Sequence, residues 1–156
     1  MSEGIVTEAV NPDLPSSITQ EYYPTIPEKF PSSRIPKNLC ELELLKLYRC
    51  VVSRGDTEGC GKEYTGYTRC RRERDVKLFA EIKDWEIGHV RGLTMDERKD
   101  YVGELEKKKA ACESELERIP YSSGFTNKMW RFQSELEQLK WRTDYINKTF
   151  KKTEPK

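Results

Sequence analysis

Apolar residues recur at helical spacing along most of the chain after Pro36, so the sequence predicts an all-α protein. The pattern divides into four helices near residues 40–54, 60–87, 95–119 and 127–150, with glycine or proline in the links. No apolar run approaches the length that a membrane-spanning helix needs.

Cysteines mark the first two of these helices. Cys40 and Cys50 enclose nine residues, Cys60 and Cys70 enclose nine more, and another nine separate the two pairs. A cysteine ten positions on has made nearly three helical turns, so each pair returns to roughly the same helix face. Of the three connectivities that four cysteines allow, an antiparallel hairpin selects Cys40–Cys70 and Cys50–Cys60.

Local signals support this hairpin. Asn38 and Glu41 predict an N-cap and a capping box ahead of the first helix, and Gly55 is placed to end it. Further apolar residues follow the helical spacing of the cysteines, and we expect Tyr64 and Tyr67 to add aromatic area to the stripe of the second helix that faces the first. These residues are Leu44, Leu47, Tyr48, Val51, Tyr64 and Tyr67.

The segments CELELLKLYRC and CGKEYTGYTRC resemble the twin Cys-x9-Cys, or coiled-coil-helix-coiled-coil-helix, proteins of the mitochondrial intermembrane space. The resemblance covers about residues 38–75. It implies a protein that lacks a cleaved presequence and is trapped in that compartment by disulfide formation. The family includes respiratory-chain accessory subunits, assembly factors, mitoribosomal proteins and copper chaperones, so the resemblance implies a location rather than one activity.

The second helix is expected to continue past Cys70, with a basic start and with Trp85 near its end, before a break bracketed by Gly88 and Gly92. The basic run is Arg71, Arg72, Arg74 and Lys77. It is either an ordinary solvated helix face or a contact for an acidic partner or anionic headgroups. His89, the only histidine, is interpreted as a structural or exposed residue.

Thr94 and Glu97 predict a capping box for the third helix, which Pro120 ends. Apolar heptad positions in the third and fourth helices predict a second antiparallel hairpin. They are Met95, Val102, Leu105, Cys112, Leu116 and Ile119, then Met129, Phe132, Leu136, Leu139, Ile146 and Phe150. Trp130, Trp141 and Tyr145 lie partly off this seam and either widen the core or contact a partner. Cys112 is expected to be a buried free thiol.

Residues 1–38 hold six prolines with scattered apolar residues, and indicate either a disordered tail or an extended arm that lies along a partner. The amino end carries acids and no arginine before Arg34, so no matrix transit peptide is expected. We therefore expect an arm at 1–37, the stapled hairpin at 38–92, a second hairpin at 93–151 and a polar tail at 152–156.

Composition narrows the function further. Charged residues make up 35% of the chain and the net charge is only +1, unlike that of a dedicated nucleic-acid binder. No phosphate-binding loop, nucleophile elbow or short-spaced metal motif is present, so neither catalysis nor a cofactor or metal is expected.

The expectation is a non-catalytic accessory subunit of a mitochondrial inner-membrane respiratory complex, peripheral on the intermembrane-space side, with complex I favoured by the resemblance. An assembly or import factor is the alternative, and a mitoribosomal protein fits the near-neutral charge less well. Candidate contacts to partner subunits are Tyr22, Tyr23, Phe30, Arg71, Arg72, Trp85, Trp130 and Trp141.

Overall fold

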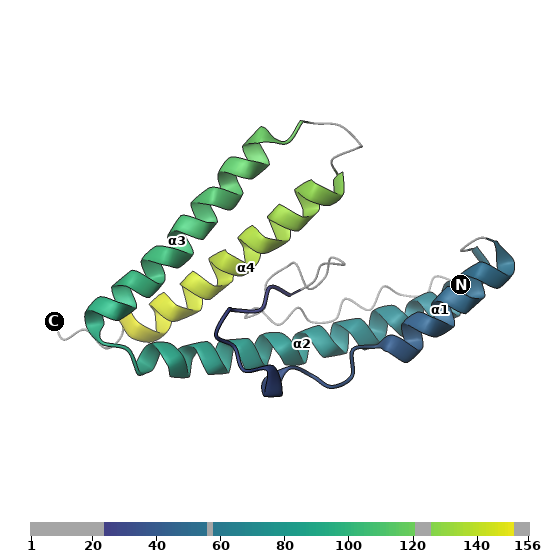
Figure 1. Cartoon of the computed structure of the whole chain (residues 1–156), viewed down its shortest axis with the longest axis horizontal. Helices are drawn as coiled ribbons and strands as arrows, with labels where there is room; N and C mark the ends of the chain where they lie inside the picture. The colour runs from purple at the N-terminus through teal and green to yellow at the C-terminus, as the bar shows by residue number, and fades with distance from the viewer. Residues whose placement is uncertain (1–23, 56–57, 121–125, 152–156) are drawn as a thin grey trace. The chain divides into compact units, whose positions relative to one another are not determined.

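A computed structural model describes residues 24–55, 58–120 and 126–151, and every regular element within them is helical (Figure 1). The long helices are α1 (Glu41–Arg54), α2 (Gly61–Arg91), α3 (Met95–Arg118) and α4 (Thr126–Phe150). Two short 3-10 turns, η2 (Ser32–Arg34) and η3 (Glu58–Cys60), precede α1 and α2. The predicted all-α fold class is confirmed.

The chain forms two compact units, each described by itself. One is Ile26–Glu86, and the other combines the residues up to Thr25 with those from Ile87 onward. The division falls inside α2, between Glu86 and Ile87. The reason lies in the packing: residues 26–35 contribute to a cluster on α2, and the last turns of α2 contribute Ile87 and Val90 to the core of α3 and α4.

In the first unit, α1 and α2 form an antiparallel hairpin stapled by the Cys40–Cys70 and Cys50–Cys60 disulfides (Figure 1). The Cα atoms of each pair are 5.9 Å apart. The predicted pairing is confirmed. Gly55 ends α1 as predicted, in the left-handed conformation (φ 74°), and its N–H donates to the carbonyl of Val51.

The predicted capping box at the start of α1 is wrong. The residue before the helix is Cys40, which has a left-handed backbone (φ 62°) and provides no side-chain cap. Asn38 instead accepts a hydrogen bond from the N–H of Cys40 at 3.0 Å, two residues on, which is an Asx turn. Asn38 therefore shapes the entry of the chain into α1 without capping it.

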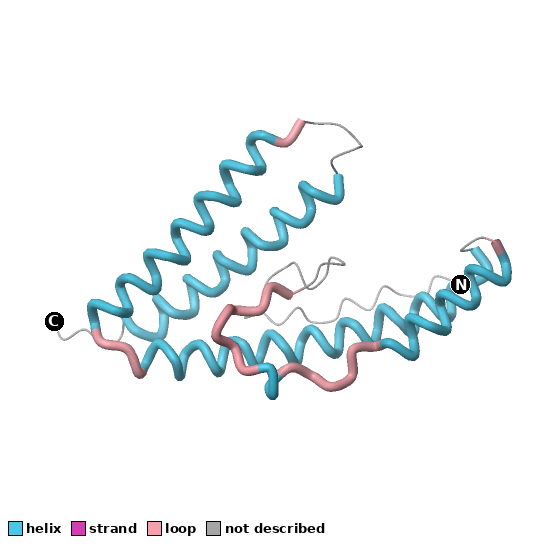
Figure 2. The backbone as a smooth tube through the Cα atoms, viewed as in Figure 1, coloured by secondary structure: helices cyan, strands magenta, loops and turns pink. Residues whose placement is uncertain are grey.

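Residues 26–35 pack along α2 within the same unit (Figure 2). Phe30 is 7% exposed and packs against Leu78 and Ile82, with its ring edge-on to that of Trp85 at 5.6 Å. Arg34 forms ion pairs with Glu81 and Asp84 of α2. This part of the predicted arm is thus held by the chain's own helix.

In the second unit, α3 and α4 lie side by side and antiparallel, as predicted (Figure 2). Thr94 begins α3 with the predicted capping box: its Oγ1 accepts from the N–H of Glu97, and its own N–H donates to the Glu97 carboxylate at 2.8 Å. That hydrogen bond lowers the pKa of Glu97.

The core of this unit combines the predicted seam with residues that lie off it. Its buried members are Val90, Leu105, Cys112, Leu136, Leu139, Tyr145 and Ile146. Trp141 packs against them, so this tryptophan and Tyr145 widen the core, the first of the two alternatives. Met95 was predicted in the seam but is 61% exposed, because it is the first residue of α3.

The predicted break bracketed by Gly88 and Gly92 begins only at Gly92, since α2 continues through Gly88 to Arg91. The helix ends at Gly92, whose N–H donates to the carbonyls of Gly88 and His89. A single glycine inside a long helix lowers its stability by only about 1 kcal/mol, which neighbouring turns offset.

Cys50→Ser tests the inner bridge. Loss of a disulfide that closes a loop of this length should lower the free energy of unfolding by about 2–3 kcal/mol, because the unfolded chain gains freedom. Thermal unfolding followed by circular dichroism measures it. Cys112→Ala, which removes a free thiol and no bridge, is the control. An unchanged melting temperature in the Cys50→Ser variant would show that the bridge is not a structural staple.

Candidate protein-interaction site

The stapled hairpin holds a helix that buries almost nothing of its own. None of the residues of α1 is buried. Its least exposed side chains are only half-buried; they are Glu43, Leu47, Cys50 and Val51. Because so little apolar area is removed from water, the two disulfides supply much of the free energy that keeps α1 folded in the hairpin.

The remaining apolar residues of α1 form one exposed surface, which we call the α1 apolar face. It consists of Leu42, Leu44, Leu45, Tyr48 and Val52, whose exposed fractions range from 41% to 64%. The spacing of Leu45, Tyr48 and Val52 places them along one side of the helix. Contiguous exposed apolar surface of this kind is characteristic of an interaction site.

This surface overturns part of the predicted packing between the two helices. Leu44 and Tyr48 were expected on the same stripe as the cysteines, and Tyr64 on the facing stripe of α2. All three are exposed, with Tyr48 at 64% and Tyr64 at 49%. Only Leu47, Val51 and Tyr67 of that set are partly buried.

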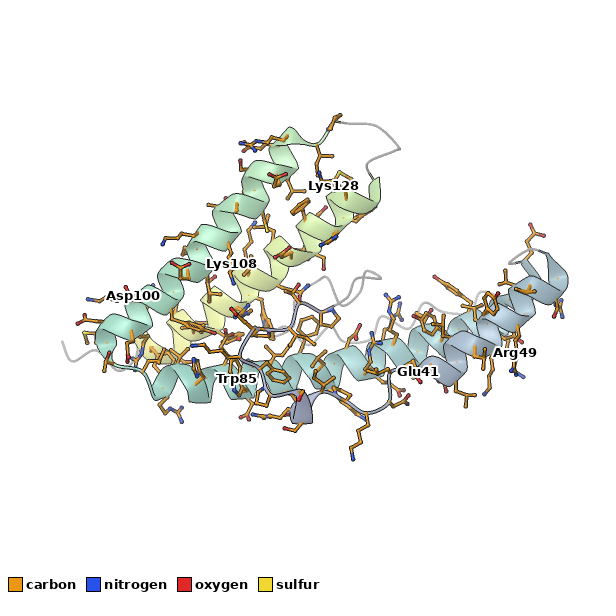
Figure 3. The ribbon with its side chains drawn as sticks, in the orientation of Figure 1. Glu41, Arg49, Trp85, Asp100, Lys108 and Lys128 are labelled. Carbon is orange, nitrogen blue, oxygen red and sulfur yellow. A yellow bond between two sulfur atoms is a disulfide. The ribbon has the colours of Figure 1, made fainter. Side chains whose placement is uncertain are left out.

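Several residues that were predicted to contact a partner pack against other residues of the same chain. Phe30 packs against Trp85 of α2, the residue labelled in Figure 3. Trp141 packs against the core of the second unit. Trp130 is partly buried on α4. Tyr22 and Tyr23 lie outside the described residues.

The basic run on α2 is only partly solvated. Arg74 forms an ion pair with Asp75 at 2.8 Å, and its guanidinium also reaches the carbonyl of Leu39 at 3.5 Å. Arg71 lies over the ring of Tyr67 at 5.9 Å, while Arg72 is exposed. Arg74 thus ties α2 to the residue just before the outer bridge, and only part of the run faces solvent.

Asp75 is a buried acid at this junction. Desolvation raises the pKa of its carboxyl above the ordinary value, and the hydrogen bond and charge of Arg74, with the charge of Arg71, oppose that effect. The neutral form of Asp75 is therefore better accommodated in the folded hairpin than in the unfolded chain.

This shift gives a pH dependence with a definite sign. Because folded Asp75 binds its proton more tightly, its contribution to stability is present at low pH and is lost as pH rises through the raised pKa. Asp75→Asn should therefore gain stability relative to the parent protein as pH rises from the ordinary pKa of an aspartic acid, about 3.9, to the raised pKa of Asp75. Thermal unfolding at a series of pH values measures this.

Arg74→Gln is the companion variant. It removes the cation that opposes the effect of burial on the pKa of Asp75. The stability of this variant should therefore fall further with rising pH than that of the parent protein. A relative stability of Asp75→Asn that falls with rising pH would mean that the ionised carboxylate is the favoured form, contrary to the expectation.

The cysteines offer little reactive chemistry. Among the described residues, Cys50, Cys60 and Glu63 are the one group with ligand atoms close enough to share a metal, within 4.8 Å. Both sulfurs are bonded to each other, so neither is the thiolate that a metal requires. Cys112 is buried, and burial followed by the charges of Glu135 and Glu113 raises the pKa of its thiol, which keeps it protonated and unreactive.

Two polar residues of α4 escaped the sequence analysis. Gln138 and Ser134 are buried, with the Gln138 amide donating to the Ser134 hydroxyl at 3.1 Å. The Gln138 carbonyl oxygen accepts from the backbone N–H of Thr25 at 2.6 Å. The end of the N-terminal segment is therefore held on α4, and no periodic pattern could have indicated it.

No protein-family model matches the chain, and no curated protein or solved structure does so either. The two bridged cysteine pairs in an all-helical fold are compatible with a twin Cys-x9-Cys hairpin. None of the helices within the described ranges is long and apolar enough to cross a membrane.

Proposed function

We propose that the protein is a non-catalytic structural subunit that binds another protein through the α1 apolar face. The observation that carries this proposal is that a helix with no buried residue presents five large apolar side chains to solvent. Exposing these apolar side chains to water is unfavourable in free energy, and a partner that covers them removes that cost.

The geometry of the face suits a helix-in-groove contact. Leu45, Tyr48 and Val52 follow the spacing by which an amphipathic helix fills an apolar groove. Arg49, one turn after Leu45, lies beside them and would add a charge at the edge of the contact (Figure 3). The two bridges hold the helix in place before binding, so little conformational entropy is lost when the partner docks.

We further propose that the partner belongs to a mitochondrial inner-membrane respiratory complex, with complex I favoured, on the intermembrane-space side. The twin Cys-x9-Cys resemblance supports this location, and the disulfides are compatible with an oxidising compartment. An assembly or import factor remains the alternative, because it would use the same exposed face for a transient contact.

Native separation of mitochondrial membranes with mass spectrometry distinguishes the two functions. A structural subunit should comigrate with one large complex at equal stoichiometry, with both disulfides formed. Recovery mainly as a small soluble species would contradict the subunit and favour the factor. Reduced Cys40, Cys50, Cys60 and Cys70 in the mitochondrial protein would contradict the compartment as well.

A charge placed on the α1 apolar face tests the contact itself. The double variant Leu45→Glu, Tyr48→Glu should lose comigration with the complex, because two carboxylates cannot enter an apolar groove without their hydration. Stability of the isolated protein should change by only about 0.5 kcal/mol per site, since both residues are exposed.

Lys46→Gln combined with Ser53→Glu is the matched control. It changes the formal charge of α1 by the same amount at exposed polar positions. A protease-protected, oxidised pool of each variant shows that import has occurred. Equal comigration of the two double variants would contradict the proposed contact.

A further inference from the structure

A cavity of about 460 Å³ lies between the first half of α3 and the end of α4, within the second unit. Its volume is in the range of about 300–1,000 Å³ that small-molecule pockets in proteins have. Val102, Ile146 and Phe150 give it an apolar lining. Ile146 is buried in the core, whereas Phe150 is partly exposed, so the apolar lining runs from the core toward solvent.

The charged residues of the cavity are mainly basic. Arg98 and Lys99 come from α3, and Lys151 follows the end of α4. None of the three forms an ion pair with another described residue. The acid of the lining, Glu106, is already paired with Lys109 at 2.6 Å. The cavity therefore has an uncompensated positive charge beside an apolar lining.

Arg98 is the basic residue that contacts the apolar lining of the cavity. Its guanidinium carbon lies 4.2 Å from the centre of the Phe150 ring, in a cation–π contact. Its Nε is buried, yet it has no hydrogen-bond partner in the part of the chain that the structure describes. The Arg98 side chain as a whole is only partly buried, and its guanidinium presents donors that match the oxygens of a carboxylate or phosphate.

We propose that this cavity binds an acidic amphiphile with a single alkyl chain. Its carboxylate or phosphate would accept hydrogen bonds from Arg98, with Lys99 and Lys151 adding favourable charge. Its alkyl chain would lie against Val102, Ile146 and Phe150. The proposal does not depend on the function of the α1 apolar face, which belongs to the other unit.

Gly103 supplies a variant that should block the cavity without disturbing the fold. It lines the cavity from within α3, and a Cβ built there would meet no neighbouring side chain or distant backbone within 4 Å. Gly103→Leu therefore places a side chain in open space and improves helix propensity. Gly66→Leu on α2 is the matched control, because that position is equally open and does not line the cavity.

Isothermal titration calorimetry on the full-length, oxidised protein tests the proposal. Dodecanoate and dodecyl phosphate, below their micelle-forming concentrations, should bind with a stoichiometry of about one, and uncharged dodecanol at least about tenfold more weakly. Inorganic phosphate, which lacks the alkyl chain, should bind more weakly than dodecyl phosphate. Equal binding of dodecanol and dodecanoate, or no binding of either acid, would overturn the proposal.

The variants locate the binding. Arg98→Gln should weaken dodecanoate binding about tenfold, and Gly103→Leu should abolish it, while Gly66→Leu leaves it unchanged. Circular dichroism confirms that each variant is folded. Vesicles of phosphatidylglycerol separate a free amphiphile from a membrane surface: binding only to vesicles, equally in the parent protein and Gly103→Leu, would overturn the cavity as the site.

Discussion

The two disulfides are the constraint on which the first unit depends. A helix of this length is marginal by itself in water, and α1 buries too little apolar area to be held by packing alone. The bridges hold it by restricting the unfolded chain, each with an effect of about 2–4 kcal/mol. A hairpin that depends on disulfides in this way is compatible with an oxidising compartment, where such bonds form and persist.

A helix held by covalent bonds need not use its apolar residues for packing. In the second unit, α3 and α4 have no disulfide, and their apolar residues meet in one buried core. In α1 the bridges replace that core, which leaves Leu45, Tyr48 and Val52 free to face outward. The same sequence property, an amphipathic helix, thus serves stability in one unit and leaves an exposed apolar face in the other.

Much of the fold follows from local rules in the sequence. The cysteine spacing predicts both bridges, the Thr94–Glu97 pair predicts the start of α3, and heptad positions such as Leu105 and Leu139 predict the second core. Features that depend on tertiary context were not predictable. The role of Asn38 depends on the left-handed backbone of Cys40, and periodicity alone does not reveal that Phe30 packs on the chain's own α2. The unpartnered Nε of Arg98 likewise appears only once the helices are packed.

The side of α1 that faces inward, in contrast, could be inferred from the position of Cys50 in the sequence. Cys50 points at its bridge partner on the neighbouring segment, so it fixes which side of α1 faces inward. Successive residues of a helix are rotated by about 100°, which places Tyr48 and Val52 about 200° from Cys50 on either side. These residues must face away from the bridge, as their exposure shows. In a stapled helix the direction of the cysteine, rather than the apolar periodicity, decides which apolar residues remain available to a partner.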